Sequence, residues 1–176
     1  MAINHEEEIL IVDKLGQEIG FGKRADLLSS NSWTRTGNVF VVLGDSVLCH
    51  KRAAGVGADP SLWTMTFGGH ARPGETPVQT AIKELSEESG LNVKQQDLEL
   101  VMVYPDRSVN KIKWIYSLRV SNSNLHLQIE EEEVEETAWI ETKELEQIYA
   151  FQDKSWTQHG YELISLQLLR SNLDNR

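Results

Sequence analysis

The sequence contains little cysteine and no long apolar run. Cys49 is the only cysteine among 176 residues, so no disulfide can form within the chain and a cysteine-based zinc site is not indicated. Cys49 lies in an apolar stretch, where we interpret it as a small buried hydrophobe. No apolar run approaches the roughly 18 residues that span a bilayer, and residues 1–8 lack the basic and apolar regions of a signal peptide. We therefore expect a cytoplasmic protein.

Positive charge is also scarce. The chain has 17 Lys and Arg against 27 Asp and Glu, a formal net charge of -10. Nucleic-acid backbones and anionic membranes select for basic surfaces, so neither is expected as a partner. A small anionic substrate that arrives with a metal ion remains compatible, because the cation supplies positive charge locally. The length and the ordinary 40% hydrophobic content predict one domain over residues 1–176.

Segments of strand character alternate with a few helical ones. Residues 8–19 predict a hairpin, and residues 23–30 are either a short helix or a loop. Residues 37–43, GNVFVVL, predict a central buried strand because they are apolar and rich in β-branched side chains. Further strands are predicted at residues 46–52, 62–67, 98–104, 111–120, 125–129 and 137–140. Thr142 is a candidate cap for a helix over residues 143–150, and residues 161–170 carry a last helical pattern. The order predicts an α/β domain with a mixed sheet.

The clearest local signals delimit one helix after residue 76. Thr76 is a suitable N-cap, Pro77 suits the first helical position, and Gln79 completes a capping box. Gly90 suits the position just after the last turn. The pattern therefore predicts a helix over residues 77–89.

This helix has two different faces. Its apolar and small residues recur at about 100° per residue and predict the face that packs inward. They are Val78, Ala81, Ile82, Leu85 and Ser89. The opposite face carries Lys83, Glu84, Glu87 and Glu88, and we expect it to be a polar, acidic surface. The three glutamates repel one another by roughly 0.2–0.5 kcal/mol per pair, a cost that a divalent cation would relieve. Alone, they are either a solvated surface or a metal site.

The spacing around this helix resembles the Nudix signature, G-x5-E-x7-R-E-U-x-E-E-x-G-U, in which U is aliphatic. Gly69 is followed by Glu75 after five residues, and the motif closes at Leu91. Every specified position agrees except the arginine, which is Lys83 here. The resemblance implies a Nudix hydrolase, with an α/β/α sandwich around a mixed central β-sheet, and a Nudix box at residues 69–91. It also makes a homodimer a candidate state.

The resemblance implies roles for particular residues. Glu84, Glu87 and Glu88 become candidates for binding Mg²⁺ or Mn²⁺ and for the general base, and the carbonyl of Gly68 becomes a further ligand. Magnesium prefers oxygen ligands and polarises phosphoryl groups, so the chemistry agrees. Lys83 is a candidate catalytic residue that can pair with Glu87 four residues later, although lysine lacks the planar fork of arginine.

Several residues outside the helix are candidates for the same site. Glu75 is interpreted as structural, and His70 as either a site residue or a loop histidine. Within the acidic run at residues 130–136, Glu133 is a candidate extra metal ligand or base; the alternative is a solvated loop. The cations expected to contact a diphosphate are Arg35, Lys51, Arg52 and Arg72.

The flanking segments resemble one branch of the superfamily, the one that includes type I isopentenyl-diphosphate isomerase. They include TRTGNVFVV, HKRA and LWTMTFGGHARPGET. The resemblance places Gly68 where the isomerase has its catalytic cysteine, and Thr34 where it has a histidine. Residues 107–114 contain no carboxylate to match the isomerase glutamate. Without these groups alkene isomerisation has no evident acid and base.

Three functions therefore remain, in order of preference. The first is Mg²⁺-dependent hydrolysis of a nucleoside diphosphate derivative or a similar small diphosphate. The second is isomerisation of an allylic diphosphate, and the third is a non-catalytic module that binds diphosphates.

Overall fold

The computed structural model describes residues 6–28, 30–123 and 125–165. Within them the strands belong to one mixed sheet that is curved and branched rather than flat. The elements in chain order are β1 (Glu8–Val12), β2 (Glu18–Lys23), α1 (Arg24–Leu28), β3 (Trp33–Leu43), β4 (Ser46–Arg52), β5 (Trp63–Thr64), β6 (Phe67–His70), α2 (Pro77–Ser89), the 3₁₀ helix η1 (Gln95–Asp97), β7 (Leu98–Asp106), β8 (Lys111–Arg119), β9 (Val134–Glu141) and α3 (Thr142–Phe151).

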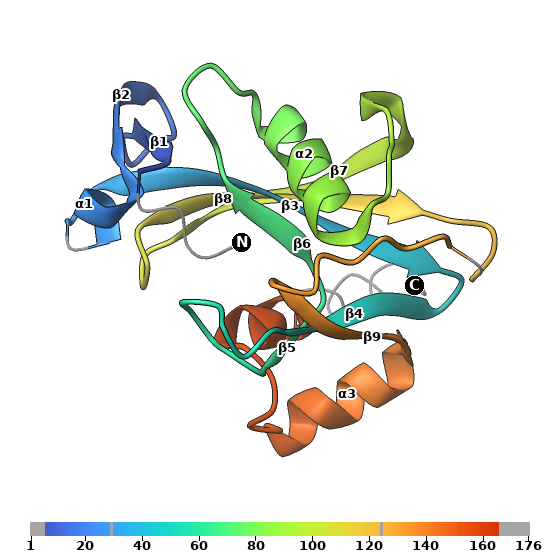
Figure 1. The fold of residues 1–176 in the computed structure, drawn as a ribbon. Coiled ribbons are helices and arrows are strands. Elements are labelled where there is room, and N and C mark those ends of the chain that lie inside the picture. Colours follow the sequence, from blue (N-terminus) through green and yellow to red (C-terminus); the bar gives the residue numbers. More distant parts are fainter. Residues whose placement is uncertain (1–5, 29, 124, 166–176) are drawn as a thin grey trace, which may run out of the picture.

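The long strand β3 is the centre of the sheet. It pairs in parallel with β8 and antiparallel with β1, β4 and β6, while β7 extends the sheet beyond β8 and β9 pairs with β4. Figure 1 shows α2 on one side of β3, β6 and β8, and α3 on the other side, beyond β4 and β9. The predicted α/β class with a mixed central sheet is confirmed.

The side chains of β3 divide the core into two halves. Val39 and Val41 pack in the cluster that contains Leu85 of α2, whereas Phe40 and Val42 pack in the cluster on the other side. Successive side chains of a strand point to opposite faces, so this alternation fixes the direction of every other β3 residue. Residues at even positions, Thr36 and Asn38 among them, therefore face away from α2.

The amino-terminal elements follow the sequence closely. β1 and β2 form the predicted antiparallel hairpin, and the segment that allowed a short helix or a loop is the helix α1. Leu15, Ile19 and Phe21 of the hairpin are exposed.

The strand predicted over residues 62–67 is wrong in its bounds, because the chain changes partners there. β5 pairs with β4, whereas β6 pairs with β3. The chain leaves one part of the sheet at Met65 and joins another at Phe67, and both side chains are fully buried at the crossing. The change of partner brings Gly68 and Gly69 alongside β3.

Two further expectations are corrected. Residues 125–129 form no strand; Leu125 and Leu127 instead pack against the α2 side of the core, and the Gln128 N–H donates to the Ser89 carbonyl (2.9 Å). The N-cap of α3 is Glu141, and Thr142 is its first residue, whose hydroxyl donates to the Asp45 carbonyl (2.7 Å).

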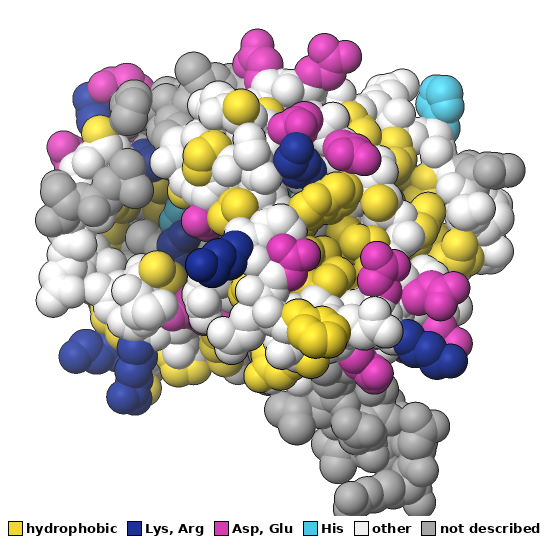
Figure 2. Space-filling model, turned by 90° about the horizontal axis from the view of Figure 1, so that it is seen from below, with side chains coloured by type: hydrophobic (Ala, Val, Ile, Leu, Met, Phe, Trp, Pro, Cys, Tyr) yellow, Lys and Arg dark blue, Asp and Glu magenta, His cyan; other side chains and the backbone are white. Residues whose placement is uncertain are grey.

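The last helical pattern is seen in part. A helix runs over residues 158–165, and the remainder of the predicted segment, residues 166–170, lies outside the described residues. Among the described helices none is long and apolar enough to cross a bilayer. Acidic and apolar side chains are interspersed on the face seen in Figure 2, which is the lower face of Figure 1.

Candidate active site

The helix α2 begins and ends where the sequence predicts. The Thr76 hydroxyl accepts from the Gln79 N–H and the Gln79 side chain accepts from the Thr76 N–H, so the capping box is complete. Gly90 follows the last turn in the left-handed region, with φ of 74°. These signals fix the position of α2 along the chain, and therefore of its glutamates, independently of tertiary packing.

Two glycines allow α2 to lie directly on the sheet. A Cβ on Gly37 would meet the Pro77 carbonyl oxygen and lie 2.6 Å from the Ala81 nitrogen. A Cβ on Gly69, which pairs with Gly37, would collide with the Glu84 carboxylate. A side chain at position 37 would push the helix away, whereas one at position 69 would displace the Glu84 carboxylate. The two glycines therefore set how near Glu84 lies to the strands.

The three glutamates of α2 have different environments. Glu88 is buried, with 7% of its surface exposed, and its carboxylate accepts from the Gly68 N–H (3.1 Å). Glu84 is mostly buried, with 14% of its side chain exposed, while Glu87 is exposed. The expectation of a solvated acidic face is therefore wrong for Glu88. Its side chain reaches the edge of β6 that does not pair with β3.

Lys83 binds different partners from the one expected. Its ammonium group lies 3.1 Å from the Glu84 carboxylate and 3.3 Å from Glu75, not beside Glu87. Glu75 also accepts from the Arg72 N–H and the Thr80 hydroxyl, so it closes the loop onto the helix. Burial alone would raise the pKa of Glu75, but these hydrogen bonds and the charge of Lys83 lower it. Lys83 thus connects the structural glutamate to a candidate ligand.

The buried carboxylates perturb one another. Burial raises the pKa of Glu84 to about 7; Glu87 and Glu7 add to the rise and Lys83 opposes it. The pKa of Glu88 is well above its ordinary value because of burial, with further contributions from the charges of Glu84 and Glu133. Acidic groups are thus concentrated where α2 meets β6, in surroundings that favour their protonated form.

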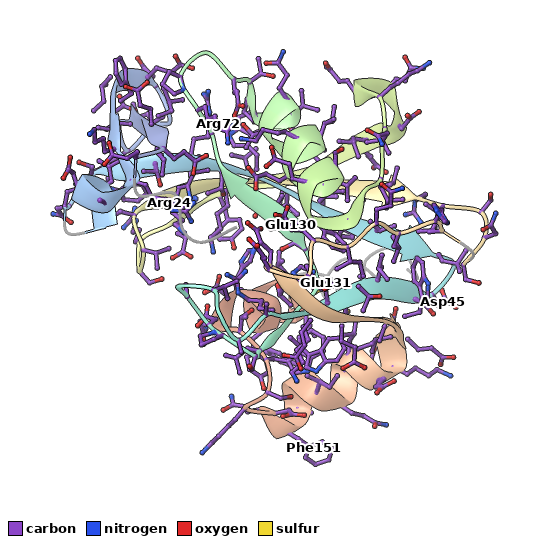
Figure 3. All side chains as sticks on the ribbon, viewed as in Figure 1. Arg24, Asp45, Arg72, Glu130, Glu131 and Phe151 are labelled. Carbon is purple, nitrogen blue, oxygen red and sulfur yellow. The ribbon has the colours of Figure 1, made fainter. Side chains whose placement is uncertain are left out.

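Glu133 belongs to this cluster. Burial raises its pKa, and so does the charge of Glu87, which places the connection before β9 beside the end of α2. Figure 3 labels its neighbours Glu130 and Glu131 between the layer that contains α2 and the layer that contains β4. The charges of the four predicted glutamates therefore act on one another, and one of the four, Glu88, contacts Gly68.

The donor set suits a hard divalent cation. Carboxylate and carbonyl oxygens are the ligands that Mg²⁺ accepts, and a cation would offset the mutual repulsion of Glu84, Glu88 and Glu133. Over the described ranges, no three His, Cys, Asp or Glu side chains already converge on one point as a ligand group. Glu84 is turned to Lys83 and Glu88 to the Gly68 N–H, so cation binding requires rotation of these side chains.

The four cations predicted to bind substrate, Arg35, Lys51, Arg52 and Arg72, lie in different surroundings. The Arg52 Nε donates to the Ala58 carbonyl (2.9 Å), and its charge lowers the pKa of both Glu88 and Glu133. Arg35 is buried and binds Glu18 (2.9 Å) and the Glu75 carbonyl (2.6 Å), which holds the loop before α2.

The two remaining cations form ion pairs at the surface. Lys51 pairs with Glu135 (2.7 Å), and Arg72 pairs with Glu7 (2.9 Å) on the loop seen in Figure 3. Of the four predicted cations, only Arg52 lines the neighbouring cleft as well as acting on the buried Glu88.

A polar cleft of about 270 Å³ opens on the face of β3 and β6 that is turned away from α2. Gly68, Gly69 and Arg52 form part of its wall, while the glutamates of α2 do not line it. The two glycines therefore separate the glutamate cluster from the cleft by the thickness of a backbone, and Arg52 borders both. His70, predicted as either a site or a loop residue, belongs to β6 and lines this cleft.

The cleft contains a charged network that the sequence did not reveal. The Lys113 ammonium group lies 2.7 Å from Asp106 and 3.6 Å from Glu162, and it donates to His159 (3.0 Å). Hydrogen bonds from Lys113 and Ser108 lower the pKa of Asp106 to about 2, although burial opposes this. The alternation of Lys111 and Lys113 with apolar residues in β8 was the one available signal. Asp106 ends the neighbouring strand β7, whereas Glu162 comes from a distant part of the chain that no local pattern connects to β8.

The matching family model decides the identity. It is the NUDIX domain, and it matches residues 33–162, about three quarters of the chain. The chain belongs to the Nudix family. The match contains β3, the box, Glu133 and every lining residue of the cleft except Arg24. The chain is therefore an enzyme of the Nudix hydrolase class, a class that generally uses divalent metals and acts on small-molecule diphosphates.

Individual relatives place this Nudix protein near the isomerase-like branch, as predicted. It is 27% identical over 150 residues to the isopentenyl-diphosphate Delta-isomerase of Cutibacterium acnes, which covers 77% of this chain and 74% of the relative. It is 31% identical over 101 residues to an uncharacterised Nudix hydrolase of Rhodococcus erythropolis, covering 56% of this chain and 55% of the relative. The match thus spans about half of that hydrolase.

A solved structure shares the fold. The crystal structure of DR0079 from Deinococcus radiodurans has a TM-score of 0.77 and covers 90% of this chain and 98% of that one, at 18% identity. At this identity the likeness shows the Nudix fold alone.

The raised pKa of Glu84 predicts how stability depends on pH without metal. Between about 4.5 and 7 the folded protein retains a proton on Glu84 that the unfolded chain has lost. The free energy of unfolding therefore falls as pH rises through this window, by roughly 3 kcal/mol at most from this group. Thermal unfolding in EDTA should show a smaller loss for Glu84→Gln and an unchanged loss for Glu146→Gln, an exposed control on α3. Equal pH dependence in Glu84→Gln and wild type would contradict this account of the cluster.

Proposed function

We propose that this Nudix protein hydrolyses a diphosphate linkage in a small polar organic diphosphate, such as a nucleoside diphosphate derivative, with Mg²⁺ or Mn²⁺ as cofactor. The observation that carries the proposal is the position of Glu88. It is a buried carboxylate among other carboxylates, it binds the Gly68 N–H, and it lies beside a cation-lined cleft. A buried charge in such surroundings is costly unless a cation compensates it.

The residues take the following roles in this proposal. Glu84, Glu87, Glu88 and Glu133 hold the cation together with the Gly68 carbonyl, and the bound cation supplies polarisation of the phosphoryl oxygens. Arg52 contacts the diphosphate, because it lies at the junction of the cluster and the cleft. Lys83 positions Glu84 and Glu75.

The general base remains a choice between two groups. Burial raises the pKa of Glu84 to about 7 before the cation binds, and a pKa near neutrality suits a general base. A glutamate in residues 130–136 is the alternative. Arg35, Lys51 and Arg72 are held in ion pairs with Glu18, Glu135 and Glu7. They can contact the substrate as predicted only when these ion pairs break. A cytoplasmic location and a homodimer remain predictions.

The named relatives favour isomerisation as a second candidate, and the cleft argues against it. Ala58 and Val109 are the only apolar side chains among its lining residues, which otherwise are polar, charged or glycine. A five-carbon hydrocarbon would find few apolar side chains to pack against in this cleft. At position 68, where the isomerase has its catalytic cysteine, glycine provides no thiol that could transfer a proton to or from an alkene. A polar organic group fits the cleft better.

The test is a substrate panel with Mg²⁺ and Mn²⁺. It includes dinucleotides, nucleotide sugars, coenzyme A and isopentenyl diphosphate, with product release followed by chromatography. We expect cleavage of at least one polar diphosphate and no formation of dimethylallyl diphosphate. Conversion of isopentenyl diphosphate to its isomer would overturn the proposal. Binding of the panel without any turnover would favour the non-catalytic module instead.

A further inference from the structure

Lys111 at the start of β8 is a sheltered cation that has no ion pair with a carboxylate among the residues that the structure describes. It lines the cleft and also an adjoining hollow of about 340 Å³. Over residues 6–28, 30–123 and 125–165, no Asp or Glu lies within ion-pair distance of its ammonium group. Lys113 has the same orientation two residues later, but Asp106 and Glu162 compensate it. Within the described residues, the same strand thus presents to the cleft one lysine with two ion pairs and one lysine with none.

Other positive groups lie near Lys111. Its pKa is lowered to about 8 by burial and by the charges of Lys113 and Arg24, while Asp106 opposes the effect. The pKa of His70 is lowered by burial and by the charges of Lys111 itself and of Arg24. Arg24 itself pairs with Glu7 (3.1 Å) and Lys113 with Asp106 and Glu162, so among the described residues Lys111 is the cation of this group that has no ion pair. An anion in the cleft would find in Lys111 a positive charge that no ion pair occupies. Figure 3 shows Arg24 at the end of the molecule that holds α1.

The register of the sheet places this cation away from the glutamate cluster. Gly68 pairs with Asn38, and Lys111 pairs with Thr34, four residues earlier on β3. Four residues of strand extend about 13 Å. One small anion cannot contact both places, so a group bound at Lys111 is different from a phosphate held beside Gly68. The cleft between them is lined by Thr36 and Asn38, which can hydrogen-bond to a linking organic group.

We propose that Lys111 is the centre of a second anion subsite, which binds a phosphomonoester or carboxylate on the organic part of the substrate, at the end of the cleft remote from the diphosphate. This inference rests on the proposed function, since it describes the same substrate. It narrows the substrate class to diphosphates that carry an additional anionic group. Lys111 donates charge-assisted hydrogen bonds to that group.

Matched pairs of ligands test the subsite. Coenzyme A and dephospho-coenzyme A, or NADP⁺ and NAD⁺, differ by one phosphomonoester, and UDP-glucuronate and UDP-glucose differ by one carboxylate. Calorimetry in EDTA measures binding without hydrolysis. In at least one pair, we expect the Kd of the more anionic member to be at least 10-fold lower than that of its partner. A factor of this size corresponds to roughly one charged hydrogen bond. The pair that shows the preference identifies whether the group is a phosphate or a carboxylate.

Two lysine variants make the test specific. Lys111→Met should reduce the preference to about 2-fold or less, and Lys111→Gln serves if the first variant does not fold. Lys143→Met, on the exposed surface of α3, changes the net charge equally and should keep the preference. No preference in any pair, or an equal preference in Lys111→Met and wild type, would overturn the subsite. Cleavage with Mg²⁺ but without preference rejects the subsite alone, whereas preference without cleavage rejects the proposed hydrolysis alone.

Discussion

Glu88→Gln is expected to lower kcat/KM for Mg²⁺-dependent hydrolysis by about 10³-fold, because the variant loses a charged oxygen ligand worth several kcal/mol of transition-state stabilisation. The fold should not suffer. Glutamine keeps the shape and can still accept from the Gly68 N–H, while it removes a buried charge that neighbouring carboxylates oppose. In EDTA the variant should therefore unfold at the same temperature as wild type or at a higher one. Initial rates on the best substrate of the panel, with unfolding curves in EDTA, measure both effects.

The control for this variant is Glu146→Gln on α3, which makes the same chemical change at an exposed position. It should keep the wild-type rate. Wild-type activity in Glu88→Gln would remove Glu88 from the reaction, and a lower unfolding temperature in EDTA would show that the ionised carboxylate stabilises the fold.

Gly37→Ala is expected to have the largest effect on stability. Its Cβ would lie against backbone atoms of α2, the Pro77 carbonyl and the Ala81 nitrogen, and backbone cannot rotate away as a side chain can. Overpacking of this kind costs about 3 kcal/mol, or roughly 10 °C in Tm for a chain of this size. Because α2 must move outward, activity should fall as well. Chemical denaturation and thermal unfolding measure the change.

Gly20→Ala in β2 is the matched control, since a Cβ there meets nothing within 4 Å. Its free energy of unfolding should stay within about 0.5 kcal/mol of wild type. Equal stability of Gly37→Ala and Gly20→Ala would mean that the contact between α2 and β3 is looser than the structure indicates.

Local signals were sufficient for the elements that carry the box. The capping residues Thr76 and Gln79 and the terminal Gly90 act within a few residues, so the bounds of α2 were predictable from sequence. The apolar, β-branched run of β3 was predictable for the same reason, although its polar first half was not. Residues 125–129 show the limit: their alternation reflects packing of Leu125 and Leu127 near the end of α2 rather than membership of a sheet.

The site was predictable only as far as the motif extends. The box gave Glu84, Glu87 and Glu88, but helix periodicity placed Glu88 on a solvated face and gave no sign that β6 buries it. Burial depends on the chain crossing from β5 to β6, which is a tertiary event. Asp106 and Lys113 meet across the paired strands β7 and β8, but Glu162 joins them from a distant part of the chain, and no sequence pattern marks that proximity.

Binding of Mn²⁺ tests the central claim most directly. Electron paramagnetic resonance of free Mn²⁺ at pH 8 counts the ions that wild type, Glu88→Gln and Glu146→Gln remove from solution. The cluster of Glu84, Glu88 and Glu133 predicts that wild type and Glu146→Gln bind alike and that Glu88→Gln binds at least 10-fold more weakly. Equal binding by Glu88→Gln and wild type would contradict the assignment of the metal site to the edge of β6.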